Sequence, residues 1–184
     1  MKILIIKLRN IGDVLLISPL FYNLKKYYGD SCILDVLVNA GTEKILQTQY
    51  LNQIHTLKRN PNKLQRIYDE LALLKAIKKE KYDMVIGLTS GERSAFLAFW
   101  SGAKIRVGFP PNSFWSKNLY THKLTPKHQH NLENNLEALR ILNIPILSKK
   151  VLAPIPQKTT NLNNLPPHFI HLHLFSRWFF KCLD

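Results

Sequence analysis

Cysteine is scarce in this sequence, and long apolar runs are missing. Cys32 and Cys182 stand far apart without CxxC spacing, so they suggest neither a disulfide framework nor a zinc site. The apolar run at residues 3–6 is much too short to span a membrane, and the small-residue cleavage pattern of a signal peptide is missing. We therefore expect a cytoplasmic protein in a reducing setting, soluble or attached to a membrane only at its surface.

Acidic residues are scarce as well. Twelve Asp and Glu stand against twenty-six Lys and Arg, which gives a formal net charge of +14. Such an excess predicts an anionic partner, whether nucleic acid, an acidic membrane surface or a phosphorylated small molecule. Charge alone does not choose among these three. The sequence has no helix-turn-helix, RRM, KH or OB signature, which argues against nucleic acid.

The sequence does contain an alternation of strand and helix patterns, and its 184 residues suit one full α/β domain and part of another. Short β-branched apolar runs predict strands at residues 3–6, 33–38, 54–57, 84–88 and 105–109. Spacings of three and four residues predict helices at 92–100, at 131–142, and along a stripe of Leu64, Ile67, Leu71, Leu74 and Ile77. Strands separated by helices imply right-handed crossovers. We therefore predict the α/β class: a Rossmann-like parallel sheet with helices on both faces.

The character of the chain changes at residues 148–167, which are rich in Pro, Asn and Thr and show no periodicity. Such a stretch is typical of an interdomain linker. It separates a domain at 1–147 from a short segment at 168–184. The HFIHLHLF run in that segment predicts the first strand of a second domain.

The stretch KLRNIGDVLL, residues 7–16, places Gly12 and Asp13 where the first strand should turn into a helix. Loops at this position bind ligands in doubly wound sheets, but the lone Gly12 lacks the G-x-G-x-x-G pattern of dinucleotide-binding loops. Asp13 has two interpretations. Its carboxylate can cap the helix that follows, with Ser18-Pro19 as a competing helix start, or it can act as a general base at the mouth of the sheet. Local spacing leaves both open.

The histidines do not predict a metal site. His128 and His130 alternate ahead of a predicted helix, and His171 and His173 share one strand face. Neither pair has a cysteine or carboxylate at metal-ligand spacing. We expect these side chains to be solvated or hydrogen-bonded.

Four segments, in order along the chain, carry a resemblance to a known family. They are KILIIKLRNIGDVLLISPLFYNLKKYY, YDMVIGLTSGERSAFLAFWSGAKIRVGF, HNLENNLEALRILNIPI and FSRWFFKC. Together they resemble the bacterial ADP-heptose:lipopolysaccharide heptosyltransferases of glycosyltransferase family 9. The last segment is similar to the heptosyltransferase III-like branch, although Leu174, Phe175 and Leu183 depart from its usual residues.

The resemblance implies the N-terminal domain of a GT-B glycosyltransferase. It places the lipopolysaccharide core or lipid A acceptor on this domain and the nucleotide-sugar donor, ADP-heptose, mainly on a C-terminal domain. It also implies inverting transfer with Asp13 as the catalytic base, without a metal or other cofactor, and contact of Ser176 and Lys181 with the donor diphosphate. The expected location is the cytoplasm, with surface contact to the cytoplasmic face of the inner membrane allowed. No nucleic-acid partner is expected.

Basic residues near the predicted strand ends and on the helices suit an acceptor that carries carboxylates and phosphates. A solvated helix face is the alternative, and we prefer it for Lys75, Lys78 and Lys79. The candidates for acceptor binding are Lys7, Arg9, Arg59, Lys63, Arg66 and Arg93.

Because the chain stops at Asp184, we expect the C-terminal donor domain to be truncated. Without donor binding the anomeric carbon is not positioned, so we expect little or no transferase activity from this polypeptide alone. A truncated or frameshifted product and one half of a split enzyme both fit. The alternative function is a non-catalytic basic module that binds lipopolysaccharide core, a membrane surface or nucleic acid.

Overall fold

The computed structural model describes residues 1–58, 60–113, 116, 118–153 and 170. Met1–Pro154 form one compact unit. Most of the predicted linker at 148–167 lies outside the described residues, as does the predicted strand and loop at 168–184 apart from Ile170.

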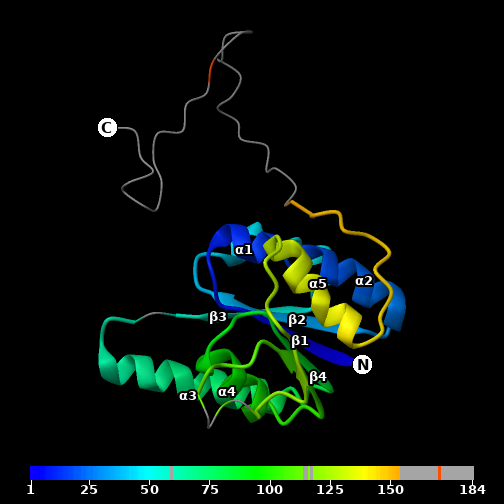
Figure 1. Cartoon of the computed structure of the whole chain (residues 1–184). Coiled ribbons are helices and arrows are strands. Elements are labelled where there is room, and N and C mark those ends of the chain that lie inside the picture. The colour runs from blue at the N-terminus through cyan, green and yellow to red at the C-terminus, as the bar shows by residue number, and fades with distance from the viewer. Residues whose placement is uncertain (59, 114–115, 117, 154–169, 171–184) are drawn as a thin grey trace. The chain divides into compact units, whose positions relative to one another are not determined.

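A six-stranded parallel sheet forms the centre of the compact unit (Figure 1). Its strands are β1 (Lys2–Lys7), β2 (Ile33–Asn39), β3 (Gln53–Leu57), β4 (Met84–Gly87), β5 (Ile105–Gly108) and β6 (His122–Lys123). They lie in the order β3-β2-β1-β4-β5-β6, and every neighbouring pair is parallel. The five strands predicted between residues 3 and 109 are confirmed, as is the Rossmann-like sheet. β6 escaped prediction because it is two residues long and polar, and only its pairing with β5 defines it.

Helices cover both faces of the sheet, as predicted (Figure 1). One face carries α1 (Ile11–Leu15), α2 (Ser18–Tyr28) and α5 (Asn131–Ile141), and the other carries α3 (Lys63–Lys79) and α4 (Glu92–Trp100). Two 3-10 turns, η1 (Glu43–Ile45) and η2 (Thr48–Tyr50), precede β3. Successive side chains of β1 point to opposite faces, so Ile3 joins Phe21 in one core while Leu4 joins Ile77 in the other. Within the described residues, no helix combines the length and apolarity needed to cross a bilayer.

The apolar stripe of α3 is buried at one end only. Leu64, Ile67 and Leu71 are 79%, 53% and 52% exposed, whereas Ile77 is fully buried and Leu74 is half-buried. At about 3.6 residues per turn, spacings of three and four residues drift around a long helix. The first turns of α3 also extend past α4 (Figure 1). The predicted helix is confirmed, and its N-terminal half presents apolar side chains to solvent.

The chain beyond α5 runs back along α2 and is tied to it. The buried amide of Asn23 accepts hydrogen bonds from the backbone N–H groups of Leu147 at 2.6 Å and Ser148 at 3.1 Å, and it donates to the Ser148 carbonyl at 2.7 Å. Ser18 Oγ accepts from the Leu152 N–H at 2.9 Å. The first residues of the predicted linker are thus hydrogen-bonded to the domain.

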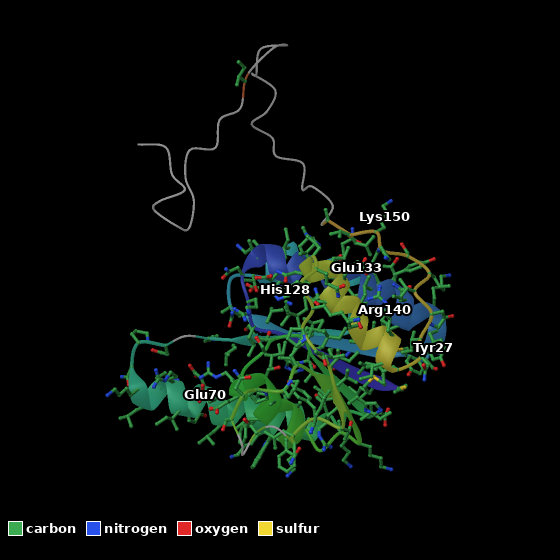
Figure 2. The ribbon with its side chains drawn as sticks, in the orientation of Figure 1. Tyr27, Glu70, His128, Glu133, Arg140 and Lys150 are labelled. Carbon is green, nitrogen blue, oxygen red and sulfur yellow. The ribbon has the colours of Figure 1, made fainter. Side chains whose placement is uncertain are left out.

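A surface ion-pair network connects this returning segment to α5. Glu133 and Arg140 lie along α5 in Figure 2, and Arg140 binds Glu133 and Glu137, each at 2.6 Å. Lys149 Nζ reaches Glu133 at 2.8 Å. Exposed pairs of this kind contribute little individually, so the hydrogen bonds to α2 remain the main attachment of the segment.

Two glycines let an aromatic ring lie across adjacent strands. A Cβ atom at Gly87 in β4 would meet the Tyr120 hydroxyl and the Ser94 hydroxyl, and one at Gly108 in β5 would overlap the Tyr120 ring and lie 2.7 Å from the Gly87 carbonyl. The Tyr120 hydroxyl bonds to Ser94 Oγ of α4 at 3.0 Å. The ring therefore packs where larger residues would block it.

Candidate functional site

Asp13 lies at the carboxyl edge of the sheet, just beyond its central strand. β1 ends at Lys7, and α1 begins after Asn10, which holds the N-cap position. Asp13 is inside the first turn of α1, so its interpretation as a helix cap was wrong. The competing helix start at Ser18-Pro19 is confirmed, because α2 begins at Ser18 with Pro19 in its first turn, although Ile17 and not Ser18 holds the cap position. Between β1 and β4 the strand order reverses, which is the usual ligand-binding position of such sheets.

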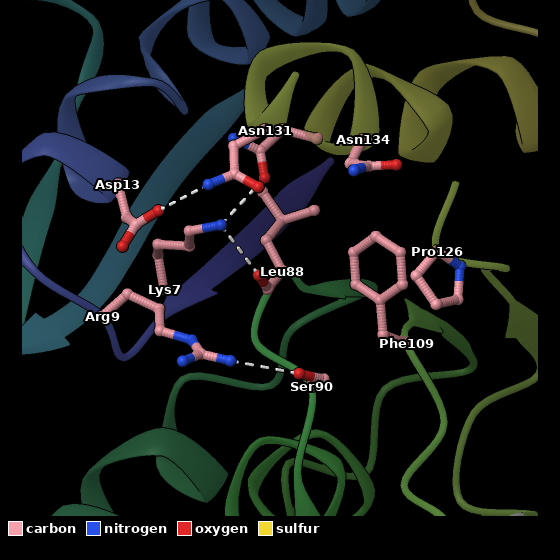
Figure 3. Close-up of a pocket in the computed structure, with 10 residues that line it drawn as sticks. Lys7, Arg9, Asp13, Leu88, Ser90, Phe109, Pro126, Asn131 and Asn134 are labelled. Atoms are coloured by element: carbon pink, nitrogen blue, oxygen red, sulfur yellow. Dashed lines mark hydrogen bonds between the residues drawn. The ribbon is translucent and has the colours of Figure 1, made fainter. Parts of the chain in front are cut away.

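A side chain from α5 holds the Asp13 carboxylate (Figure 3). Asn131, the first residue of α5, donates from Nδ2 to Asp13 Oδ1 at 3.1 Å. α5 begins there because His130 caps it, its Nδ1 accepting from the Leu132 N–H at 3.2 Å. The other Asp13 oxygen points away from Asn131 in Figure 3. A neutral amide thus orients the carboxylate without cancelling its charge.

Lys7 is the buried cation beside this carboxylate. It is 5% exposed, and its Nζ donates to the Leu88 carbonyl and to Asn135 Oδ1, both at 2.9 Å. Burial lowers the pKa of the Lys7 ammonium from 10.5 to about 8, although the negative charge of Asp13 opposes the shift. The ammonium thus has two hydrogen-bond partners within the protein. The predicted contact of Lys7 with the lipopolysaccharide acceptor stays a prediction.

Asn135 joins the cation to the helices around it. This amide is 1% exposed, and while Oδ1 accepts from Lys7, its Nδ2 donates to the Leu16 carbonyl at 3.0 Å. Asn131 and Asn135 are four residues apart, so they lie on the same side of α5. One helix face therefore holds both the carboxylate and the cation of the site.

The loop after β4 forms the opposite rim. Thr89 Oγ1 accepts from the Leu8 N–H at 2.8 Å, and Arg9 donates to Ser90 Oγ at 3.2 Å. Asn39, at the end of β2, donates to the Arg9 carbonyl at 3.2 Å. These bonds place the exposed Arg9 guanidinium beside the carboxyl edge.

These groups surround a cavity of about 330 Å³ (Figure 3). Leu88, Phe109 and Pro126 supply an apolar wall, and the remaining walls are polar or charged. A carboxylate at the mouth of such a cavity can accept a proton from a bound hydroxyl, and a guanidinium at its rim can bind a phosphate or carboxylate. The lining residues are Lys7, Arg9, Asp13, Leu88, Ser90, Phe109, Pro126, Asn131, Asn134 and Asn135.

The other predicted acceptor-binding residues do not line this cavity. Lys63 and Arg66 are exposed on the first turns of α3. Arg93 forms an ion pair with Glu70 and lines a separate, largely apolar cavity of about 620 Å³ with Phe96 and other residues. Arg59, Ser176 and Lys181 lie outside the described residues.

Titratable ligands do not cluster in the described part of the chain. Among those residues, no three His, Cys, Asp or Glu side chains come close enough to hold a metal ion. That the predicted transfer reaction needs no metal stays a prediction, as do the roles predicted for the individual site residues.

Sequence reasoning missed the two asparagines that organise the site. In the segment NLENNLEALR the leucines mark one face of the helix, whereas Asn131, Asn134 and Asn135 recur at spacings of three and four on another face. Such a polar stripe on an otherwise amphipathic helix is the signal that could have found them. It would not have revealed that the stripe faces Asp13.

Comparisons with known proteins give the chain its relatives. The model of the family described as glycosyltransferase family 9 (heptosyltransferase) matches residues 70–160. Lipopolysaccharide heptosyltransferase 3 of Escherichia coli is 26% identical over 186 residues, which cover 94% of this chain and 54% of that relative.

Solved structures share the fold. Escherichia coli heptosyltransferase WaaC with ADP is 20% identical with a TM-score of 0.66, covering 79% of this chain and 48% of that one. Escherichia coli ADP-heptose lps heptosyltransferase II is 19% identical with a TM-score of 0.64, covering 87% and 47%. The chain thus spans about half the length of the relatives it matches. The predicted resemblance and the predicted fold of the GT-B heptosyltransferases are confirmed.

Proposed function

Because this chain carries a glycosyltransferase family 9 domain, we propose that it forms the acceptor side of an inverting heptosyltransferase in which Asp13 is the general base. The acceptor hydroxyl oxygen forms the new bond to the anomeric carbon of the heptose. Its proton moves to the Asp13 carboxylate, and ADP leaves with the electron pair of the broken bond.

The observation that carries this proposal is the 3.1 Å hydrogen bond from Asn131 to Asp13 at the mouth of the cavity. A base must be oriented toward the hydroxyl whose proton it accepts. Asn131 orients one carboxylate oxygen and leaves the carboxylate charged. Lys7 adds a positive charge beside this carboxylate.

The proposed substrates follow from the relatives. One relative is named a lipopolysaccharide heptosyltransferase and another an ADP-heptose enzyme, so we assign lipopolysaccharide core as acceptor and ADP-heptose as donor. The cations proposed to bind acceptor phosphates or carboxylates are Lys7, Arg9, Lys63, Arg66 and Arg93, together with Arg59, which lies outside the described residues. Ser176 and Lys181 are proposed for the donor diphosphate, and transfer is proposed to need no metal. We place this activity in the cytoplasm.

The test measures ADP release from ADP-heptose in the presence of lipopolysaccharide acceptor. The 184-residue polypeptide is assayed alone and after fusion to the C-terminal half of Escherichia coli lipopolysaccharide heptosyltransferase 3. We expect little release from the polypeptide alone, because positioning the donor supplies a large part of the rate. The fusion should release ADP.

Asp13→Asn in the fusion should lower the rate by about 10² to 10⁴, the usual range for losing a general base. Asp30→Asn is the matched control, since Asp30 is exposed and follows the far end of α2. A fusion that keeps its full rate with Asp13→Asn would refute the base assignment. Acceptor binding without any ADP release would favour the alternative of a non-catalytic basic module.

A further inference from the structure

The outward side of α3 is apolar in its first half and basic in its second. At about 3.6 residues per turn, Leu64, Ile67, Tyr68 and Leu71 fall on one side of the helix, and Lys75 and Lys78 continue the same row. The four apolar residues are 79%, 53%, 69% and 52% exposed. Both lysines are exposed as well. These six residues are called the outer row of α3.

Aromatic side chains of α4 extend the outer row. Phe96 and Trp100 stack with ring centroids 6.0 Å apart, and they are 45% and 39% exposed. Lys78 Nζ lies 4.9 Å from the centroid of the Trp100 ring, which connects the two helices at the surface. The outer row together with Phe96 and Trp100 is called the α3–α4 face.

The acidic side chains of α3 contact residues that do not belong to the outer row. Glu70 pairs with Arg93, and Asp69 accepts from Gln65 at 3.0 Å. Within the described residues, Lys75 and Lys78 form no ion pair. The α3–α4 face therefore offers positive charge beside exposed apolar and aromatic groups.

This chemistry selects one occupant. Basic residues next to a Leu, Ile and aromatic surface are typical of helices that lie in the interface of an anionic bilayer. A second copy of this chain would bring its own net charge of +14 against the lysines, which opposes self-association. The geometry points to binding of the α3–α4 face to the surface of a phospholipid bilayer with anionic headgroups.

The placement of α3 gives this contact a consequence. α3 follows β3, and in a parallel sheet the carboxyl ends of β3 and β1 meet the same edge. The first turns of α3 therefore lie at the edge of the sheet where Asp13 lies, and a bilayer on the α3–α4 face would approach that edge from the face opposite α1. Lipid binding does not depend on the proposed transferase activity, although it would bring a lipid-linked acceptor to that edge.

Vesicle flotation tests the contact with the 184-residue chain. The probes are phosphatidylglycerol–phosphatidylethanolamine vesicles and neutral phosphatidylcholine vesicles, both without lipopolysaccharide, so a failed transferase assay has no bearing on the result. We expect binding to the anionic vesicles that weakens as salt rises. Ile67→Ser with Leu71→Ser should lower the partition coefficient about tenfold, because two apolar side chains leave the lipid.

Matched variants separate lipid contact from general damage. Lys75→Gln with Lys78→Gln should lower anionic binding about tenfold and reduce its salt dependence. Leu147→Ser is the control, since Leu147 is 61% exposed in the segment tied to α2. Circular dichroism checks the fold of each variant. Should the serine variant fail to fold, an environment-sensitive fluorophore on Tyr68→Cys should shift to the blue with anionic vesicles, while one on Leu147→Cys should not.

Three outcomes would overturn the proposal. The first is unchanged vesicle binding by the serine variant, and the second is equal binding to neutral and anionic vesicles. The third is that the chain does not bind vesicles but forms a concentration-dependent dimer in sedimentation velocity, which the serine substitutions abolish.

Discussion

Asn131 Nδ2 lies 3.1 Å from Asp13 Oδ1, although 118 residues separate the two in the chain. The start of α5 thereby meets the first turn of α1 at the edge of the central strand (Figure 3). A hydrogen bond to a charged oxygen is stronger than one between neutral groups. This contact orients the carboxylate that we propose as the base.

Asn131→Ala should therefore slow transfer without abolishing it. Losing one hydrogen bond to a charged group predicts a fall in kcat of about tenfold in the fusion enzyme, with KM little changed. Steady-state kinetics of ADP release measures both constants. Asn112→Ala, at an exposed position, should leave them unchanged. An equal effect of the two substitutions would argue against a positioning role for Asn131.

Lys7 predicts an alkaline limit to the activity. Burial lowers the pKa of its ammonium to about 8, so above that pH the neutral amine loses the positive charge beside Asp13. We expect the transfer rate to fall as the pH rises past about 8. Lys7→Met should already be slow at pH 7 and should lack this limb. A wild-type rate that stays constant up to pH 9.5 would contradict the assignment.

The same shift has a stability consequence of defined sign. The pKa of Lys7 in the folded chain, about 8, lies below the ordinary value of 10.5, so the unfolded chain binds more protons between these two pH values. The free energy of unfolding attributable to Lys7 should rise across that window, by roughly 3 kcal/mol at most. Denaturant unfolding of wild type and Lys7→Met at several pH values measures the difference. Parallel pH profiles for the two chains would refute it.

His55 predicts a loss of stability in acid. Burial lowers its pKa from 6.5, despite the opposing charge of Asp35. Tyr82 donates its hydroxyl proton to Asp35 at 2.7 Å, so His55 Nε2, 3.0 Å away, donates to the Tyr82 oxygen. Because the unfolded chain binds the proton more readily, stability should be complete above pH 6.5 and should fall as the pH decreases below it.

Substitution of His55 tests this pH dependence. His55→Gln keeps an N–H donor for Tyr82 but does not titrate, so its unfolding free energy should vary less between pH 7 and pH 5 than that of wild type. His128→Gln is the control at an exposed site and should follow wild type. The interpretation fails if His55→Gln and wild type lose stability in step.

Gly108→Ala should destabilise the fold. The new methyl group would overlap the Tyr120 ring and lie against the Gly87 carbonyl, and both are packed. We expect a loss of roughly 2 kcal/mol in the free energy of unfolding, as for other overpacked cores. Gly12→Ala meets no atom within 4 Å in α1 and should change stability by less than about 1 kcal/mol, in the favourable direction. Chemical denaturation compares the two.

Short-range pattern was sufficient for most elements of the sheet. Runs such as residues 3–6 and 84–88 are apolar on both faces, and a strand covered by helices on both sides demands that composition. β6 could not be found this way, because His122 and Lys123 become a strand only through their bonds to β5. The helical repeat of apolar residues in α3 was visible in the sequence too. Which side of this helix is buried depends, however, on where α4 packs.

The sequence by itself determined a parallel α/β sheet and the position of Asp13 at the turn after its first strand, because local periodicity and chain order specify both. Only the tertiary structure decided that Asn131 holds Asp13, that Asn135 and Leu88 hold Lys7, and that the apolar residues of α3 face outward. Those relationships join residues far apart in the chain. No local pattern encodes them, since they depend on how the helices dock on the sheet.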